Sequence, residues 1–317
     1  MNVRVLILLL VLVSLATPAL SWWCMGHMLV AAIGQKFLQK IKPDSFETIN
    51  KLISIQAQYS PLSPDFVTAA CWADDVKATS RLEAGWHFIN LPIIGDSPPI
   101  QAIPSNTKYD YTIVWALDTI NGTLAAHDTR TSILEQARLL YWLIHFVGDV
   151  HQPLHASTLY SATHEGPVGD MGGNLYKIKS YKGMNNLHSF WDSAAGVFPT
   201  NPRRPLSPAD ADNISAWADK IMHEYPFEMF QKEMMTDTFS GWSKESWQIS
   251  RDLAYKTPEF AELTQDYVDA AQDMCMQRLA LGGYRLGWTL AQLFGRSNFT
   301  TGGDFTSEQK ASFRNLL

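Results

Sequence analysis

Cysteine is scarce in this chain, and its positions are far apart. Cys24, Cys71 and Cys275 form no Cys-x-x-Cys pair, which argues against a zinc site built from paired thiolates. Three is an odd number for an oxidising compartment, so Cys24 with Cys71 is one pairing to consider and Cys275 is then a free thiol. The spacings alone do not decide the pairing.

Long apolar runs are also missing beyond the N-terminus. Residues 1–21 contain one apolar run of twelve residues and small residues before a cut after Ser21, the pattern of a secretory signal peptide. The run is too short to span a bilayer, and Arg278 and Arg285 interrupt the best later candidate for a span of about 18 residues. We therefore expect a protein of the secretory pathway, secreted or retained in an endomembrane compartment, without stable membrane insertion.

Positive charge is in the minority. The chain has 25 lysines and arginines against 31 aspartates and glutamates, a formal net charge of −6, and loss of the signal peptide with its single charged residue, Arg4, makes this −7. A net acidic protein has no global attraction for nucleic acid. Any polyanion must therefore be held by a local positive group.

One apolar stretch, residues 139–155, contains polar side chains that a protein core does not accommodate cheaply. His145 and Asp149 are four residues apart, so a helix projects both from one face. Pro153 should end that helix and let His155 turn back towards the same point. These groups either hydrogen-bond to one another, the commoner arrangement for an isolated pair, or bind a metal ion.

The rest of the chain favours the metal, because the same residue types recur in other apolar segments. The full set of candidate ligands is His27, Asp74, His87, His145, Asp149, His155, His188 and Asp192. Nitrogen and oxygen donors without thiolates suit zinc with open coordination positions, at about four ligands per ion. A purely hydrogen-bonded explanation would need several independent coincidences, so we expect a site with two or three ions and a bridging carboxylate.

The remaining pattern is mostly helical. We predict helices over 28–41, 67–77 with Ser63 or Asp65 as cap, 109–127, 130–149, 186–192, 208–225, 244–255 and 258–294. A long connection is expected over 92–106, and a turn over 170–174 is expected to join a small hairpin near 175–178. Because the candidate ligands span residues 27–192, one domain must contain them. We predict an all-α fold with at most a small β-hairpin, a single domain over 22–295 and a polar tail over 296–317 that frays.

The motifs that carry these ligands resemble a known family, the zinc-dependent single-strand-specific nucleases and 3′-nucleotidases, or class I, mung bean nuclease-like enzymes. Bacterial zinc phospholipase C shares their helical fold. Six segments carry the resemblance in order: 22–27, 72–74, 86–88, 145–155, 170–174 and 186–192. The resemblance implies a monomeric hydrolase that cleaves the 3′-O–P bond of single-stranded RNA and DNA to 5′-nucleotides and dephosphorylates 3′-nucleotides.

The resemblance also implies three zinc ions. The first would be held by Asp74, His87, His145 and Asp149, the second by His155, His188 and Asp192, and the third by His27, Asp149 and the α-amino nitrogen and carbonyl oxygen of Trp22. Asp149 would then bridge the first and third ions. Zinc lowers the pKa of a bound water to roughly 7, so a metal-bridging hydroxide is the expected nucleophile. Three divalent ions outweigh three aspartates and supply the local positive charge.

Other residues are assigned to the substrate by the same resemblance, with Asp74, Asp149 and Lys77 as the catalytic set. Lys77, one helical turn after Asp74, either contacts a phosphate or is simply solvated. Phe88 matches a base-stacking ring, the alternative being a core aromatic; such stacking is worth roughly 1–3 kcal/mol per base and requires an unpaired base. The matching base pocket comprises Gly172, Gly173, Asn174 and Asn90. Asn90 replaces an acidic residue frequent in fungal members, so base preference is not predicted.

Two alternatives to the nuclease remain. A phospholipase C-type phosphodiesterase has the same metal architecture, but Asp192 in place of glutamate, the short spacing from Trp22 to His27, and the pair Phe88 and Asn174 favour the nuclease. A zinc-binding protein without catalysis is the alternative of another class. The sequons at Asn121, Asn213 and Asn298 predict N-glycosylation on the secretory route.

Overall fold

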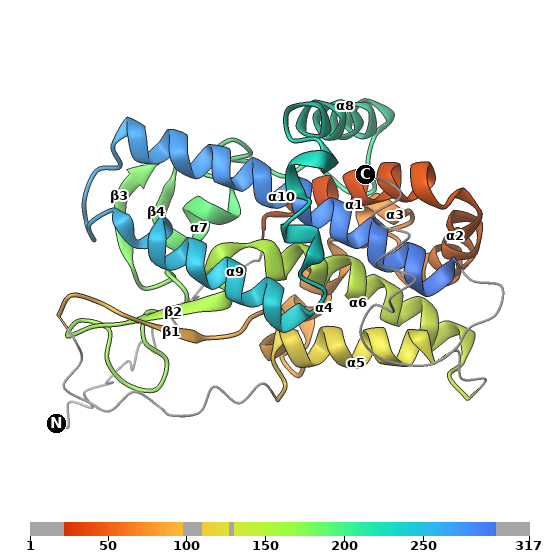
Figure 1. Cartoon of the computed structure of the whole chain (residues 1–317), viewed down its shortest axis with the longest axis horizontal. Helices are drawn as coiled ribbons and strands as arrows, with labels where there is room; N and C mark the ends of the chain where they lie inside the picture. Colours follow the sequence, from red (N-terminus) through yellow and green to blue (C-terminus); the bar gives the residue numbers. More distant parts are fainter. Residues whose placement is uncertain (1–21, 98–109, 127–129, 296–317) are drawn as a thin grey trace, which may run out of the picture.

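Long helices form the body of the molecule (Figure 1). The computed structural model describes residues 22–97, 110–126 and 130–295, so the predicted signal peptide, the predicted tail and Asn298 lie outside the described residues. At the centre, α1 (Cys24–Ile41), α6 (Ile133–His151) and α10 (Gln265–Phe294) pack together. Glycines permit the close crossing of α1 and α10, because a Cβ at Gly287 would lie 2.7 Å from the carbonyl oxygen of Gly34.

Further helices surround this centre: α2 (Pro43–Ala57), α3 (Phe66–Ala69), α4 (Trp72–Thr79), α5 (Ile113–Ala125), α7 (Leu187–Asp192), α8 (Pro208–Glu224) and α9 (Phe239–Asp252). Side chains satisfy backbone N–H groups at several of their first turns, as expected of N-caps. Asp65 accepts from two backbone N–H groups at the start of α3, and Ser132 accepts from Glu135 at the start of α6. None of the described helices is long and apolar enough to cross a membrane.

Two pairs of short strands complete the fold. β1 (Leu91–Ile94) runs parallel to β2 (Ser157–Tyr160), with Leu91 opposite Ser157 and Ile94 opposite Tyr160. β3 (Lys177–Tyr181) and β4 (Met184–Asn186) form an antiparallel hairpin. Each strand of the parallel pair continues a segment that contains candidate ligands, since β1 follows the 3₁₀ turn Ala84–His87 and β2 follows the 3₁₀ turn Pro153–Ala156.

The predicted all-α class is confirmed, while several boundaries differ. The helix expected over 67–77 is two helices, because the chain turns at Ala70 and Cys71. The hairpin is joined by Lys182 and Gly183, not by the turn over 170–174. Helix α2 and the parallel strand pair were not predicted, and α10 begins at Gln265, where Thr264 caps it.

Candidate metal centre

Helix α6 brings the first two candidate ligands together. From Leu140 to His151 every residue of α6 is buried, so the polar pair His145 and Asp149 lies inside the core. The Nε2 atom of His145 lies 3.0 Å from the Oδ2 atom of Asp149, as the four-residue spacing predicts. The helix ends at His151, and Pro153 opens the 3₁₀ turn that contains His155. The loop residue His155 thus returns to the same region.

Three groups of ligand atoms meet around this pair. The first group comprises Asp74, His87 and His145. The Oδ1 atom of Asp74 lies 3.7 Å from Nδ1 of His87 and 3.8 Å from Nε2 of His145. Nδ1 of His87 is also 3.0 Å from Oδ2 of Asp149, so the structure brings together all four residues predicted for the first ion.

The second group comprises His155, His188 and Asp192. On α7, Nε2 of His188 lies 3.3 Å from Oδ2 of Asp192, again at a spacing of four residues. Nε2 of His155 lies 4.0 Å from the other carboxylate oxygen. These are the three residues predicted for the second ion.

The third group comprises His27, His145 and Asp149. Nε2 of His27 lies 3.4 Å from Oδ1 of Asp149, and the two imidazoles of His27 and His145 stack with their centroids 4.0 Å apart. Trp22 is fully buried beside them, and its indole N–H donates to the carbonyl of Gly148 at 3.0 Å. A Cβ at Gly148 would lie 2.6 Å from Nδ1 of His27, so glycine leaves room for that ring.

Backbone carbonyls orient three of the imidazoles. Nδ1 of His145 donates to Ala70 O at 2.6 Å, Nδ1 of His155 donates to His87 O at 2.7 Å, and Nδ1 of His188 donates to Gly172 O at 2.6 Å. A proton on Nδ1 leaves the lone pair on Nε2, which in each case faces the candidate ligand group. This is the arrangement that metal-binding histidines require.

Atoms left without hydrogen bonds show that the three groups fit metal ions. Among the described residues, Oδ1 of Asp74, Oδ1 of Asp149 and Nε2 of His155 are buried and have no hydrogen-bond partner. Such atoms are costly in a protein interior. A cation bound among these atoms would accept their unused lone pairs, which no hydrogen bond within the described part of the chain satisfies.

The charge states of these groups fit the same conclusion. Burial lowers the pKa of His27, His87 and His155 well below the usual histidine value, so the rings are neutral and able to act as ligands. Burial raises the pKa of Asp149 to about 6 despite the opposing effect of His145, and it raises the pKa of Asp192 well above its usual value. Carboxylates that ionise reluctantly beside neutral rings require a cation in order to carry their charge.

The predicted substrate residues differ in how deeply they are buried. Lys77 is half-buried on α4, and its charge contributes to lowering the pKa of His87. Phe88 is 37 % exposed, which places its ring at the surface and not in the core, and Asn90 is exposed. Gly172 and Gly173 are buried, and Asn174 is half-buried.

Sequence reasoning missed Gln152. Its Nε2 donates to Oδ1 of Asp192 at 2.6 Å, and its Oε1 accepts from the backbone N–H of Leu154 at 2.6 Å. Gln152 is fully buried and links the end of α6 to the second ligand group. The signal available in the sequence was a polar side chain beside Pro153 within an apolar segment.

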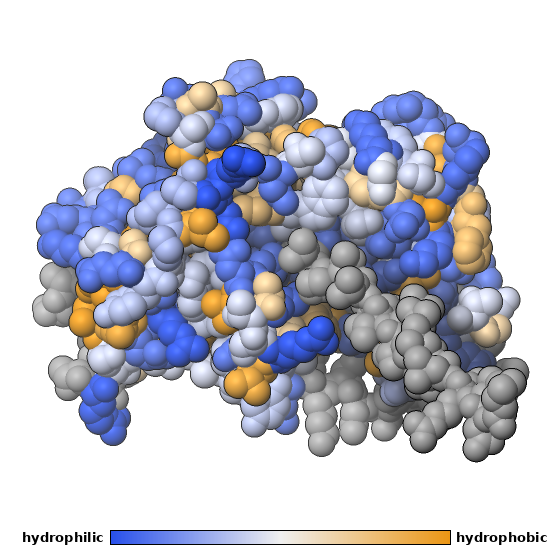
Figure 2. All heavy atoms as spheres, turned by 180° about the vertical axis from the view of Figure 1, so that it is seen from behind, coloured by the Kyte–Doolittle hydropathy of each residue, from blue (hydrophilic) through white to orange (hydrophobic). Residues whose placement is uncertain are grey.

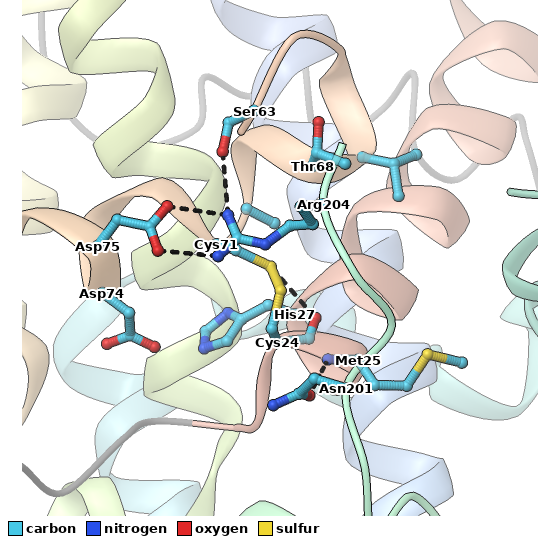
Figure 3. The surroundings of a disulfide bond; sticks show 12 residues. Cys24, Met25, His27, Ser63, Thr68, Cys71, Asp74, Asp75, Asn201 and Arg204 are labelled. Carbon is cyan, nitrogen blue, oxygen red and sulfur yellow. Dashed lines mark hydrogen bonds and ion pairs between the residues drawn. A yellow bond between two sulfur atoms is a disulfide. The ribbon is translucent and has the colours of Figure 1, made fainter. Parts of the chain in front are cut away.

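A disulfide joins two of the segments that contain ligands (Figure 3). Cys24 and Cys71 are bonded, which confirms this pairing, and Cys275 is a buried free thiol. Cys24 precedes His27 by three residues, and Cys71 precedes Asp74 by three residues. The cross-link therefore fixes the starts of α1 and α4 relative to each other.

A second, non-covalent connection lies beside the disulfide. Arg204 donates two hydrogen bonds to the carboxylate of Asp75, at 2.8 and 2.9 Å, and a third to Ser63 (Figure 3). Asn201 accepts from the backbone N–H of Met25 at 3.0 Å. The loop with Asn201 and Arg204 thus holds the same two helices that the disulfide joins.

Replacing both Cys24 and Cys71 by serine should lower the free energy of unfolding by about 4 kcal/mol, because the cross-link closes a loop of sequence separation 47. Metal retention should also fall, since His27 and Asp74 are then less fixed. Urea unfolding of the metal-loaded variant measures the first effect and elemental analysis the second. Cys275→Ala, which removes a thiol but no cross-link, is the control; equal losses in both variants would contradict the prediction.

The combination of fold and site defines a class of protein. A mainly helical chain that gathers five buried imidazoles, two buried carboxylates and the half-buried Asp74 into three neighbouring groups has the architecture of a metal-dependent hydrolase. The chain belongs to the S1/P1 nuclease family, whose model matches residues 22–295. It is therefore a nuclease, a hydrolase of nucleic acids.

The alignments with known relatives cover nearly the whole length of each relative. Endonuclease 2 of Arabidopsis thaliana is 27% identical over 303 residues, covering 92% of this chain and 97% of the relative. Nuclease S1 of Aspergillus oryzae is 26% identical over 308 residues, covering 86% and 94%. Nuclease P1 of Penicillium citrinum is 23% identical over 303 residues, covering 86% and 98%.

Proposed function

We propose that this chain is a zinc-dependent nuclease that binds three zinc ions and hydrolyses the 3′-O–P bond of single-stranded RNA and DNA and of 3′-nucleotides. The observation that carries the proposal is the closeness of the ligand groups: His145 belongs to two of them, and the two oxygens of Asp149 face His27 and His87, which suits several ions in one centre. Its donors are nitrogen and oxygen, which suit zinc with open positions. Because the chain is net acidic, we assign phosphate binding to this centre, where bound cations would supply the positive charge.

The residues around the centre have separable tasks in this proposal. Asp149 directs Oδ1 towards His27 and Oδ2 towards His87 and His145, so this one carboxylate would be a ligand of two ions. Zinc bound there would supply Lewis-acid chemistry, lowering the pKa of an attacking water to roughly 7 and neutralising charge on the phosphate. Lys77 contributes positive charge at the edge of the centre, and Phe88 stacks on an unpaired base, which selects single strands.

The direct test is incubation of the mature protein, starting at Trp22, with single-stranded RNA, 3′-AMP, 5′-AMP and phosphatidylcholine, with and without a chelator. We expect cleavage of the RNA and of 3′-AMP, little action on 5′-AMP, and loss of activity on chelation that zinc restores. Hydrolysis of phosphatidylcholine instead would identify a phospholipase C-type enzyme. Bound zinc without any turnover would identify a non-catalytic zinc-binding protein.

Phe88→Ala should weaken the binding of substrates that carry a base, without disturbing the metal ions. Loss of a stacking interaction of roughly 1–3 kcal/mol corresponds to about a 5- to 150-fold higher KM for 3′-AMP. Turnover of ribose 3-phosphate, which has neither a base nor any other aromatic ring, should stay near that of the parent. Leu82→Ala, at an apolar side chain that is 88 % exposed, is the matched control. Equal losses on both substrates would show that Phe88 acts in another way.

The cellular part of the proposal follows the secretory route. Removal of residues 1–21 would make Trp22 the N-terminal residue, and its α-amino group and carbonyl would complete the ligands of the His27 group. Of the predicted glycosylation sites, Asn213 is exposed on α8 and Asn121 is half-buried on α5. On the face shown in Figure 2, hydrophobic residues are scattered in small groups among hydrophilic ones, which supports a monomer.

A further inference from the structure

A buried carboxylate outside the three ligand groups holds several segments together. Asp170 is fully buried and accepts four hydrogen bonds. Its Oδ1 accepts from the backbone N–H of Leu159 at 2.7 Å and from the hydroxyl of Thr158 at 3.3 Å. Its Oδ2 accepts from the backbone N–H of Gly173 at 2.9 Å and from the hydroxyl of Tyr255 at 2.8 Å. Thr158 shares its one hydroxyl proton with Val168 O at 2.9 Å, whereas the two backbone N–H groups and Tyr255 each donate to Asp170, so the site requires an acceptor with two oxygens.

The turn that Asp170 closes has an uncommon backbone. Met171, Gly172 and Gly173 are consecutive residues in the left-handed region, with φ of 56°, 63° and 84°. This region is unfavourable for a side chain such as that of Met171 and persists only where the surroundings enforce it. The bond from Gly173 N–H to Asp170 is one of two side-chain contacts across this turn, and Leu175 N–H donates to the carbonyl of Asp170 at 3.0 Å.

Carbonyls of the same turn contact two residues of the site. Gly172 O accepts from Nδ1 of His188 at 2.6 Å and so fixes the ring that faces Asp192. Met171 O accepts from the side-chain amide of Asn174 at 2.8 Å, and the backbone N–H of His188 donates to Gly173 O at 3.2 Å. One turn therefore sets the orientation of a candidate metal ligand and of a candidate base-contacting amide.

We propose that Asp170 is a positioning residue that couples metal binding at the His155, His188 and Asp192 group to base recognition by Asn174. It acts by holding Gly173 N–H, which fixes the left-handed turn and, through its carbonyls, both side chains. The part that concerns the base rests on the proposed nuclease function. The part that concerns the metal rests only on the geometry of His188.

The test is Asp170→Asn, which preserves shape but leaves one accepting oxygen and points an NH₂ group at donors. Partners that orient metal ligands usually contribute about 10- to 100-fold to metal affinity or activity, and we expect a loss of that size in zinc retention. Zinc release from the loaded protein into graded chelator should show one ion leaving early while the others remain. The KM for 3′-AMP should rise more than the KM for ribose 3-phosphate, which has no base, because Asn174 is displaced as well.

Tyr255→Phe is the matched control, since it removes one donor from the same oxygen and leaves the bond to Gly173 N–H in place. It should retain zinc and KM values close to those of the parent. Gly173→Ala disturbs the turn without altering Asp170, because alanine is strained at a φ of 84°, and its Cβ would also press on the backbone of His188 at 3.2 Å. If Asp170→Asn and Gly173→Ala both act through the turn, the double variant should lose no more zinc affinity than the single variant that binds zinc more weakly.

Unchanged zinc retention and unchanged KM values in Asp170→Asn would overturn the proposal, as would losses that multiply in the double variant. If Asp170→Asn fails to fold, the test rests on Gly173→Ala. Retention of all zinc and normal KM values in that variant would also overturn the proposal. A parent protein that does not hydrolyse 3′-AMP would contradict the proposed function. The zinc-release measurement would still decide the role of Asp170 in that case.

Discussion

Asp149→Asn should cost this protein more than one metal ion and lower turnover of 3′-AMP by at least about 100-fold, beyond the range typical of groups that only orient ligands. The reason is that the two oxygens of Asp149 face different groups, with Oδ1 at 3.4 Å from His27 and Oδ2 at 3.0 Å from His87. An asparagine keeps one neutral oxygen and cannot serve two cations. Elemental analysis and 3′-AMP kinetics measure the two effects.

Substitutions of two other aspartates serve as controls for that result. Asp192→Asn affects only the group with His155 and His188, so it should lose about one ion and less activity than Asp149→Asn. Asp252→Asn removes an exposed carboxylate paired with Arg251, far from any ligand group in sequence, and should change neither quantity. Retention of three zinc ions and near-normal turnover in Asp149→Asn would rule out the shared-ligand assignment.

Starting the mature chain one residue early should remove one zinc ion and lower turnover by at least about 10-fold, if the α-amino group of Trp22 is a ligand. That amine has a pKa of about 7.7–8.0, against about 10.4 for lysine, so zinc takes its lone pair at little cost. An added methionine converts it into an amide nitrogen, which is a poor ligand. Trp22 is fully buried and Trp23 N–H donates to the backbone carbonyl of Asp192 at 2.9 Å, so the start of the mature chain is held beside the ligand groups.

The experiment compares protein beginning Met-Trp22, with the methionine retained, and the same protein after enzymatic removal of that methionine. Zinc content and 3′-AMP turnover should both recover on removal, which separates a ligand effect from a folding defect. If the extended protein already binds three zinc ions and turns over at the rate of the trimmed one, the terminus is not a ligand.

Local periodicity explains how much of the centre could be predicted from sequence. His145 with Asp149 and His188 with Asp192 are each set by one helix, and a spacing of four residues places their side chains together in any context. The all-α class follows from the same periodicity. Pro153 marks the end of α6 for an equally local reason, because proline cannot donate a backbone hydrogen bond.

Long-range contacts explain what could not be predicted. The carbonyls that orient His145 and His155 come from Ala70 and His87, which are 75 and 68 residues away, so no local pattern indicates them. The parallel strands β1 and β2 are four residues each and gain their partners only when the chain folds. The same holds for the bond between Gln152 and Asp192, which spans 40 residues.

The link between Cys24 and Cys71 also bears on where such an enzyme can act on RNA. Reducing compartments such as the cytosol keep thiols reduced, and the disulfide forms only where the surroundings are oxidising. A newly made chain in the cytosol therefore lacks the covalent bond that holds the segments with His27 and Asp74 in register. The reducing cytosol would then limit cleavage of the producing cell's own RNA, and the nuclease would become fully active only in an oxidising compartment.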